Sequence, residues 1–212
     1  MSNLRIAGVF AYSGNPGPDA SPDERRIWGR KEGELAVAVA GELRAAGLPC
    51  ETVSVAGTPS APYAAAVDGV SEVRPGTYVF YDAASARRAV CDWQDCALFV
   101  RATVVSKPSP DRVVIDAGSK VLTTESRPVA GNSGNPGYAS IVEAPLSFIS
   151  KLWEEHAVLV LDEVGMGLEV GDVINLIPFH VCPTVNLADH LYGFRGEFVE
   201  TVLNVDARGC ST

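Results

Sequence analysis

Two residues of metal-binding type, His180 and Cys182, lie two positions apart in the segment GDVINLIPFHVCPTVNLADH. On a β-strand, residues i and i+2 project from the same face, so an imidazole and a thiolate would lie side by side. Zinc takes nitrogen and sulfur ligands, and a site with few protein ligands keeps coordination positions open for a substrate. Pro178 and Pro183 flank the pair, which favours a strand end. Taken by itself the spacing is compatible with a divalent-metal site, but a small core cysteine beside a hydrogen-bonded histidine is the commoner arrangement.

Composition and charge limit the classes of partner. The chain has 212 residues, enough for one large or two small domains. A net charge of −9 with only 17 Lys and Arg argues against nucleic acid or an anionic membrane as a partner. No apolar run approaches the length of a membrane span, and the N-terminal residues MSNLRIAGVF lack a signal-peptide pattern. Five cysteines at irregular spacings indicate reduced thiols and a cytoplasmic protein.

The first part of the chain predicts alternating strands and helices. Apolar runs at residues 4–12, 50–56 and 70–80 are typical of strands, the third broken by a Pro-Gly pair. A long helix is expected between the first two runs, and a short Ala-rich helical piece follows the second. This alternation predicts parallel pairing of the strands.

The long helix has a clear start signal. Ser21-Pro22-Asp23-Glu24 has the form of a capping box, and it predicts a helix that runs to about Ala46 and ends at Gly47. Helical spacing places four apolar residues on one face, which is expected to be the buried face: Ile27, Leu35, Val39 and Leu43.

The second part of the chain is mostly β-structure, with a boundary near residues 83–96. Two Val-, Ile- and Thr-rich runs around SKPSPD predict an antiparallel hairpin. A loop rich in Gly, Asn and Pro is expected over residues 127–140. Three further strand-like segments follow it: KLWEEHAVLVLDE, GDVINLIPFHV and LYGFRGEFVETVLNV.

The segment IPFHVCPTVNLADHLYGFRGEFVE resembles the D-serine dehydratase-like domain of D-threonine aldolases and eukaryotic-type D-serine dehydratases. These are metal-activated pyridoxal phosphate (PLP) enzymes of the alanine racemase-like fold. The resemblance implies that His180 and Cys182 bind the divalent metal, and a thiolate ligand favours Zn²⁺ over Mn²⁺ because it is the softer ligand. Asp189 and His190 are expected at the surface or beside the ligands. His156, in a family-like EEH segment, is either near the active site or structural.

The segment VRPGTYVFYD is similar to the RPG segment of alanine racemase-like enzymes. In that family the Gly and the next residue donate backbone N–H groups to the PLP phosphate, which implies Gly76 and Thr77 here. The family's preceding loop implies that Gly57 and Thr58 bind the same phosphate. From the residues alone, N–H groups at such strand ends can hold a phosphate, but they also occur in ordinary loops.

The same resemblance extends to the rest of the PLP pocket. Arg74 occupies the place of the racemase arginine that lies at the pyridine nitrogen. Tyr78 and Tyr81 either line the pocket or belong to the core and rim of the barrel. Relatives carry a His shortly after the first strand, and Asn15 stands there instead.

The family fold is a (β/α)8 barrel followed by a β-domain. This chain matches only its C-terminal half, so the expected fold class is α/β plus all-β. About the last three βα units of a partial barrel, residues 1–85, precede a C-terminal antiparallel β-domain with the metal motif, residues 90–212. The family's Schiff-base lysine lies on the first barrel strand. None of the chain's four lysines fits that pattern (Lys31, Lys107, Lys120 and Lys151), so the Schiff-base lysine is expected to be absent.

These resemblances imply a PLP- and divalent-metal-dependent lyase, either a dehydratase or a retro-aldolase. Its substrates would be small D-3-hydroxyamino acids such as D-serine or D-threonine. The alternative is a non-catalytic metal-binding homologue or one half of a split complex. Three parallel strands cannot close a barrel, so the native product starts upstream, a partner completes the barrel, or the remnant has repacked. The resemblance also implies a homodimer.

Overall fold

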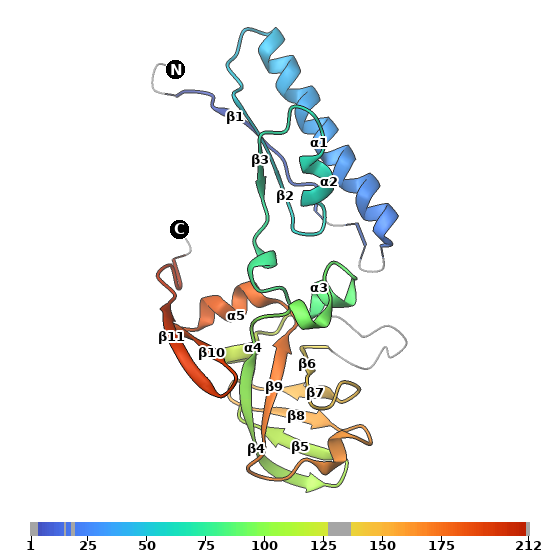
Figure 1. Cartoon of the computed structure of the whole chain (residues 1–212), viewed down its shortest axis with the longest axis vertical. Helices are drawn as coiled ribbons and strands as arrows, with labels where there is room; N and C mark the ends of the chain where they lie inside the picture. Colours follow the sequence, from blue (N-terminus) through green and yellow to red (C-terminus); the bar gives the residue numbers. More distant parts are fainter. Residues whose placement is uncertain (1–3, 15, 18–19, 127–136, 211–212) are drawn as a thin grey trace. The chain divides into compact units, whose positions relative to one another are not determined.

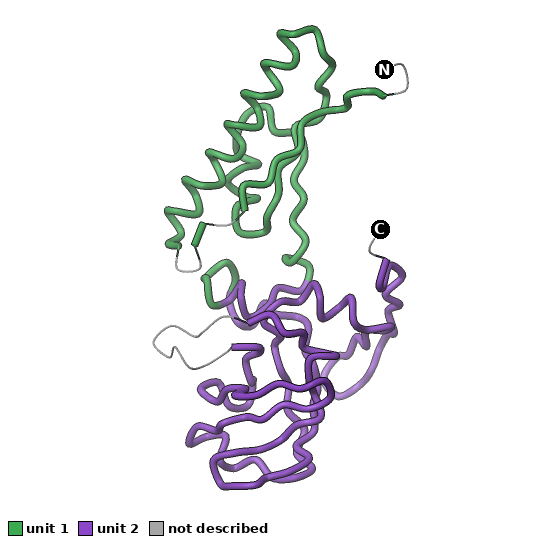
Figure 2. Tube along the Cα trace, turned by 180° about the vertical axis from the view of Figure 1, so that it is seen from behind, with its two compact units in different colours: residues 1–79, 87–91 green, residues 80–86, 92–212 purple. Residues whose placement is uncertain are grey.

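The computed structural model describes residues 4–14, 16–17, 20–126 and 137–210. The chain divides into two compact units, residues 1–79 with 87–91 and residues 80–86 with 92–212 (Figure 2). Asn15 and most of the loop predicted at residues 127–140 lie outside the described residues. None of the described helices has the length and apolar character that a membrane crossing requires.

The first unit is built on a small parallel sheet in the order β1-β2-β3 (Figure 1). The strands are β1 (Gly8–Phe10), β2 (Thr52–Ala56) and β3 (Glu72–Arg74), each shorter than its apolar run, and the expected parallel pairing is confirmed. Helices α1 (Pro22–Ala45) and α2 (Ala61–Ala65) pack against the sheet, and a 3-10 helix, η1 (Thr77–Val79), follows β3. The core of this unit consists of Ala36, Ala40, Cys50, Val53, Val55 and Ala64.

Helix α1 begins where the sequence predicts it. The backbone N–H of Glu24 donates to Ser21 Oγ at 3.2 Å, and the backbone N–H of Ser21 donates to Glu24 Oε2 at 2.7 Å. Two helix-terminal N–H groups that would otherwise lack intrahelical acceptors are therefore bonded. The capping box is confirmed.

Replacing Ser21 with alanine should lower the free energy of unfolding by about 1 kcal/mol, because the first turn of α1 loses its side-chain acceptor. Ser21→Asp keeps an acceptor and should stay close to the wild type. Urea unfolding followed by far-UV circular dichroism measures both changes. Equal midpoints for Ser21→Ala and the wild type would contradict the cap's contribution.

The buried face predicted for α1 is wrong. Ile27, Leu35 and Val39 are 60%, 63% and 41% exposed, and of the four predicted residues only Leu43 packs partly against the core. The residues buried on α1 are Arg25, Gly29, Glu32, Gly33, Ala36 and Ala40.

Close packing against α2 explains this choice of face. A Cβ atom at Gly29 would lie 2.7 Å from the carbonyl oxygen of Ser60, and one at Gly33 would lie 2.9 Å from a methyl group of Val67. Small residues on this face let the two helices approach, and no room is left there for leucine or isoleucine side chains.

The second unit is organised around a six-stranded antiparallel sheet in the order β6-β9-β4-β5-β8-β7. Its strands are β4 (Val100–Ser109), β5 (Arg112–Ile115), β6 (Ala139–Ile141), β7 (Phe148–Leu152), β8 (Ala157–Val160) and β9 (Val173–Pro178). The long β4 pairs with β9 along its first part and with β5 along its second. The hairpin predicted around SKPSPD is confirmed as the β4–β5 pair.

Short helices and a separate hairpin complete this part of the chain. The helices are α3 (Ala83–Arg87), α4 (Ser119–Leu122) and α5 (Val181–Leu187), with 3-10 turns η2 (Trp93–Asp95) and η3 (Gly165–Gly167). Strands β10 (His190–Arg195) and β11 (Phe198–Asn204) form a two-stranded antiparallel sheet. The core of the second unit lies on the six-stranded sheet and includes Val113, Ile115, Leu122, Ile149, Leu159, Ile174 and Leu176.

The segment DAGSK meets the β7–β8 turn at Gly118. A Cβ atom there would lie 2.3 Å from the carbonyl oxygen of Trp153 and 2.4 Å from that of Glu154. The backbone N–H groups of Ser119 and Lys120 donate to the same two carbonyls, at 2.7 and 3.1 Å. Only glycine allows this approach, and the contact fixes the start of α4.

Candidate metal and phosphate sites

His180 and Cys182 do not lie on a strand. Strand β9 ends at Pro178, His180 is the N-cap of α5 with φ −131° and ψ 114°, and Cys182 lies in the first helical turn. The expectation that both side chains leave the same face of a strand is therefore wrong. Pro183 fits the helix because N–H groups of the first turn have no intrahelical acceptor to lose. The hydroxyl of Thr184 closes the turn by donating to the His180 carbonyl at 3.1 Å.

The helix start still brings the two side chains together. The imidazole of His180 is hydrogen-bonded to Cys182, and its Nδ1 lies 2.6 Å from Oε2 of Glu125. Donation to the Cys182 sulfur raises the pKa of His180 to about 9; burial opposes this shift, and the Glu125 carboxylate adds to it. The imidazole thus lies within hydrogen-bonding reach of the Cys182 sulfur. A divalent metal bound by both groups would replace the proton of this hydrogen bond.

If it binds a metal, the motif would supply two ligands and leave further coordination positions open. Among the described residues, no group of three His, Cys, Asp or Glu side chains is arranged to hold a metal ion. A fully enclosed structural zinc site, which needs four protein ligands, is therefore not formed by this part of the chain. The nitrogen-sulfur donor set does suit zinc.

A buried carboxylate outside the motif holds its backbone in place. Asp82 is 2% exposed, and its Oδ2 accepts the backbone N–H of Val181, the residue between His180 and Cys182, at 3.1 Å. Its Oδ1 accepts the N–H and the hydroxyl of Ser85 at 2.8 and 2.7 Å. Asp82 was not among the residues predicted from the sequence. An aspartate three residues before a serine, at the start of an Ala-rich stretch, is the local signal of its capping role.

The residues expected to bind phosphate lie at the carboxyl end of the parallel sheet, directly after strands β2 and β3. Ala56 pairs with Arg74, so Gly57 and Thr58 follow β2 beside the place where Gly76 follows β3. Gly57 has φ +101°, a conformation that favours glycine, and the space around the Cβ position of Gly76 is open. The structure therefore brings the two loops together.

Thr58 carries an unsatisfied polar atom. Its Oγ1 is buried and has no hydrogen-bond partner among the residues that the structure describes. A buried hydroxyl without a partner is costly, and such atoms call for a specific explanation. An anion held at this end of the sheet would accept its hydrogen bond, so the residues present fit a phosphate group.

The buried carboxylate of Glu32, on α1, accepts hydrogen bonds from the backbone at this end of the sheet. It is 3% exposed; its Oε1 accepts the backbone N–H of Ala56 at 3.0 Å, and its Oε2 accepts the N–H of Ser13 at 3.3 Å and the Ser13 hydroxyl. The carboxylate thus joins the loop after β1 to the end of β2. Glu32 was not predicted from the sequence, because the apolar spacing of α1 pointed to another face of the helix as the buried one.

Arg74 reaches across the sheet. Its guanidinium donates to Ser54 Oγ and to the carbonyl of Ala11 (2.9 Å for the latter) and stacks on the Phe10 ring, 3.8 Å from the centroid. Ser54 in turn donates to Glu72. Arg74 is therefore anchored to β2 and, beyond it, to the end of β1.

Tyr78 and Tyr81 fall in different units. Tyr78 lies in η1 and is 51% exposed, whereas Tyr81 belongs to the second unit and has φ +51°. Thr77, the remaining residue expected at the phosphate, begins η1 directly after Gly76.

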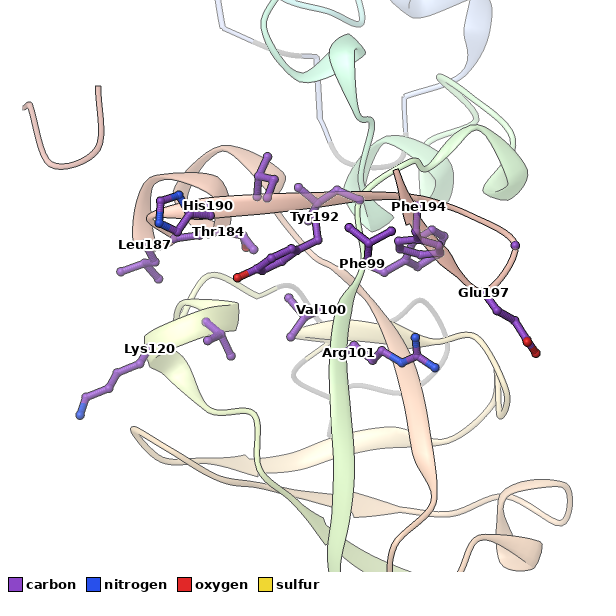
Figure 3. Close-up of a pocket in the computed structure, with 16 residues that line it drawn as sticks. Phe99, Val100, Arg101, Lys120, Thr184, Leu187, His190, Tyr192, Phe194 and Glu197 are labelled. Atoms are coloured by element: carbon purple, nitrogen blue, oxygen red, sulfur yellow. The ribbon is translucent and has the colours of Figure 1, made fainter. Parts of the chain in front are cut away.

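None of the four lysines lies on the parallel sheet. Lys31 is in α1, Lys107 in β4, Lys120 in α4 and Lys151 in β7. Lys120 borders a cavity of about 530 Å³ beneath the β10–β11 hairpin, but its side chain leads away from the cavity (Figure 3), and its amine pairs with Glu155. The rings of Phe99, Tyr192 and Phe194 form much of the wall instead.

The other histidine and aspartate candidates lie apart from the metal motif. Asp189 pairs with Arg208 at 3.0 Å, and His190 Nδ1 lies 3.0 Å from Asn204 Oδ1 across the hairpin. His156 is exposed in the β7–β8 turn. None of these contacts involves His180 or Cys182.

Comparison with known proteins identifies related chains. The family described as "Putative serine dehydratase domain" matches residues 97–194. A D-threonine aldolase from Arthrobacter sp. is 34% identical over 216 residues, which are 100% of this chain and 54% of the aldolase. The crystal structure of D-threonine aldolase from Filomicrobium marinum has a TM-score of 0.83 and 34% identity, over 99% of this chain and 55% of that one.

A third relative was solved without metal. It is a Cys-to-Ala variant of D-threo-3-hydroxyaspartate dehydratase "in the metal-free form", with a TM-score of 0.82 and 27% identity, over 95% of this chain and 55% of that one. The chain thus spans about half the length of the curated relatives it matches. Alanine racemase-like neighbours share the arrangement, which confirms the expected fold class of a partial α/β barrel followed by an antiparallel β-domain.

Proposed function

Because residues 97–194 match the putative serine dehydratase domain and the chain is similar to D-threonine aldolases and D-serine dehydratases, we propose that it forms part of a PLP- and divalent-metal-dependent lyase acting on small D-3-hydroxyamino acids. The observation that carries the metal assignment is the contact between His180 and Cys182 at the start of α5. The unsatisfied Thr58 hydroxyl at the carboxyl end of the parallel sheet supports the PLP assignment.

The two groups of residues would have separate tasks. When bound, PLP would withdraw electrons from Cα of the amino acid, while a metal such as Zn²⁺ or Mn²⁺ would act as a Lewis acid on the β-hydroxyl. His180 and Cys182 would hold the metal. Thr58 would donate its hydroxyl hydrogen to the phosphate, and backbone N–H groups of Gly57, Gly76 and Thr77 would add to this binding. Arg74 is proposed to lie near the pyridine ring, and Tyr78 at the rim.

Thr58→Val should weaken PLP binding by about tenfold or more, because a hydrogen bond to a charged phosphate is lost. The same change should leave the free energy of unfolding unchanged or higher, since it removes a buried hydroxyl that has no partner among the described residues. Fluorescence titration with PLP, and with pyridoxal, which lacks the phosphate, measures the effect. Thr58→Ser is the matched control and should bind normally. Equal PLP affinity in Thr58→Val and the wild type would contradict the phosphate site.

The activity is tested on the protein isolated from its native cells. With PLP and a divalent metal, an aldolase would convert D-threonine to glycine and acetaldehyde, and a dehydratase would convert D-serine to pyruvate and ammonia. Borohydride reduction would fix PLP covalently on a lysine of the active protein. No product from either amino acid, with metal and PLP bound, would contradict the proposal.

The second candidate is a non-catalytic metal-binding homologue or one half of a split complex. In that case the Schiff-base lysine would be lost or would come from another chain, which the positions of the four lysines allow, because none lies on the parallel sheet. Such a protein would bind zinc but give no borohydride adduct. In the split form, a partner chain or a second copy would complete the barrel and supply the lysine. The cysteine count and spacing support a cytoplasmic setting for either function.

A further inference from the structure

The HVC motif consists of His180, Val181 and Cys182. Outside this motif, Glu125 is a side chain that contacts His180 directly. Its Oε2 lies 2.6 Å from His180 Nδ1, across a separation of 55 residues in the sequence. Glu125 follows α4, and α4 packs against α5, which begins directly after His180. The histidine side chain is 35% exposed and the glutamate 55%. The contact therefore joins two elements that the fold places side by side.

The turn that delivers Glu125 is held in an unusual conformation. Thr123, which ends α4, has φ 65° and ψ −179°, a region of backbone space that is normally restricted to glycine. Its hydroxyl accepts the backbone N–H of Glu125 at 3.2 Å. The chain thus turns sharply after α4, and this turn directs the glutamate toward His180.

The contact with Glu125 engages Nδ1 of the imidazole, and the second ring nitrogen, Nε2, lies outside this contact. A histidine that binds a metal through one ring nitrogen commonly donates the other N–H to a carboxylate. That bond fixes the tautomer and the ring orientation, and it makes the metal-bound nitrogen a stronger donor. With Nδ1 bonded to Glu125, Nε2 is the nitrogen available to a metal.

We propose that Glu125 is a positioning residue of the metal site, which holds His180 through Nδ1 so that Nε2 binds a divalent cation together with the sulfur of Cys182. This inference rests on the proposed function for the existence of the metal site. Glu125 itself is not assigned as a ligand, since the described residues contain no three-ligand group. The competing interpretation is an exposed ion pair without functional effect, of the kind common on protein surfaces.

Zinc affinity distinguishes the two interpretations. The full 212-residue chain, without PLP, would be titrated with Zn²⁺ in competition with a chromophoric chelator. Glu125→Gln keeps the size of the side chain and removes its charge; Glu125→Ala removes the contact. Both should lower zinc affinity by about 10- to 100-fold, the usual effect of losing such a carboxylate. Glu163→Gln makes the same charge change at an exposed glutamate of the same unit and should leave zinc affinity unchanged.

A second measurement reads the ring itself. Nitrogen-15 NMR of the zinc-loaded wild type should show His180 with a protonated Nδ1, slow to exchange with water, and a metal-bound Nε2. In Glu125→Ala the Nδ1 proton should exchange rapidly, while the urea unfolding midpoint stays at the wild-type value. A surface ion pair without functional effect would change neither zinc affinity nor the nitrogen bound to metal.

The possible failures are distinct. If both Glu125 variants bind zinc as tightly as the wild type does, the role of Glu125 is overturned, and the proposed metal site still stands. A wild type that binds no zinc would overturn the metal site and this inference with it. Metal bound through Nδ1 in the zinc-loaded wild type would overturn the inference even if affinity fell in the variants.

Discussion

Purified His180→Ala and Cys182→Ala chains are expected to hold no stoichiometric zinc, whereas the wild type is expected to hold about one zinc ion per chain. Two protein ligands would leave the open coordination positions that a catalytic metal requires. The motif provides one nitrogen and one sulfur donor, hydrogen-bonded to each other at the start of α5. Removing either leaves a single protein ligand. The loss of affinity should exceed the roughly 100-fold effect of removing a supporting carboxylate.

Arg74→Ala is the matched control for this experiment. Arg74 belongs to the other unit, where its guanidinium bonds to Ser54 and Ala11, so its loss should leave the zinc content unchanged. Metal content would be measured by atomic emission after dialysis against trace zinc. Stoichiometric metal retained by both the His180 and the Cys182 variant would refute the assignment of the site.

Asp82→Ala should destabilise the second unit by about 3 kcal/mol, because buried donors that lose their acceptor each cost about 1–3 kcal/mol. The carboxylate accepts the backbone N–H of Val181 and both the N–H and the hydroxyl of Ser85, and it is almost completely buried. Of these donors, only the serine hydroxyl can rotate toward another acceptor. The variant should also bind zinc more weakly when folded, because the amide between the two ligands is no longer held.

Urea unfolding of Asp82→Ala would be compared with that of Asp206→Ala, which removes an exposed carboxylate of the same unit. Asp82→Asn, which retains one acceptor oxygen, should fall between the two. If Asp82→Ala and Asp206→Ala unfold at the same urea concentration, the buried carboxylate contributes nothing measurable to this unit.

Features encoded within a few residues were readable from the sequence. The start of α1 follows from Ser21 and Glu24, which bond to each other's backbone three positions apart. The β4–β5 hairpin follows from turn residues between two β-branched runs. Such features depend on local hydrogen bonds and backbone preferences, which change little with the rest of the fold.

Features that depend on distant partners were not readable. The bulky apolar residues of α1 face outward because its small residues pack against α2, a choice set by the space between two helices rather than by helical spacing. The HVC motif was expected on a strand, yet the chain turns into α5 there, with Pro183 in the first helical turn. The local sequence is compatible with a strand or with the start of a helix at this point, and tertiary packing selects the helix.

The sequence by itself determined the types of chemistry available: the nitrogen and sulfur donors of His180 and Cys182, and the glycine-containing strand ends at Gly57 and Gly76. The tertiary structure decided which carboxylates support the metal motif. Glu125 and Asp82 lie 55 and 99 residues from the groups they contact. A hydrogen bond over such a separation forms only when the fold has met the entropy cost of bringing the segments together, so no local pattern can reveal it.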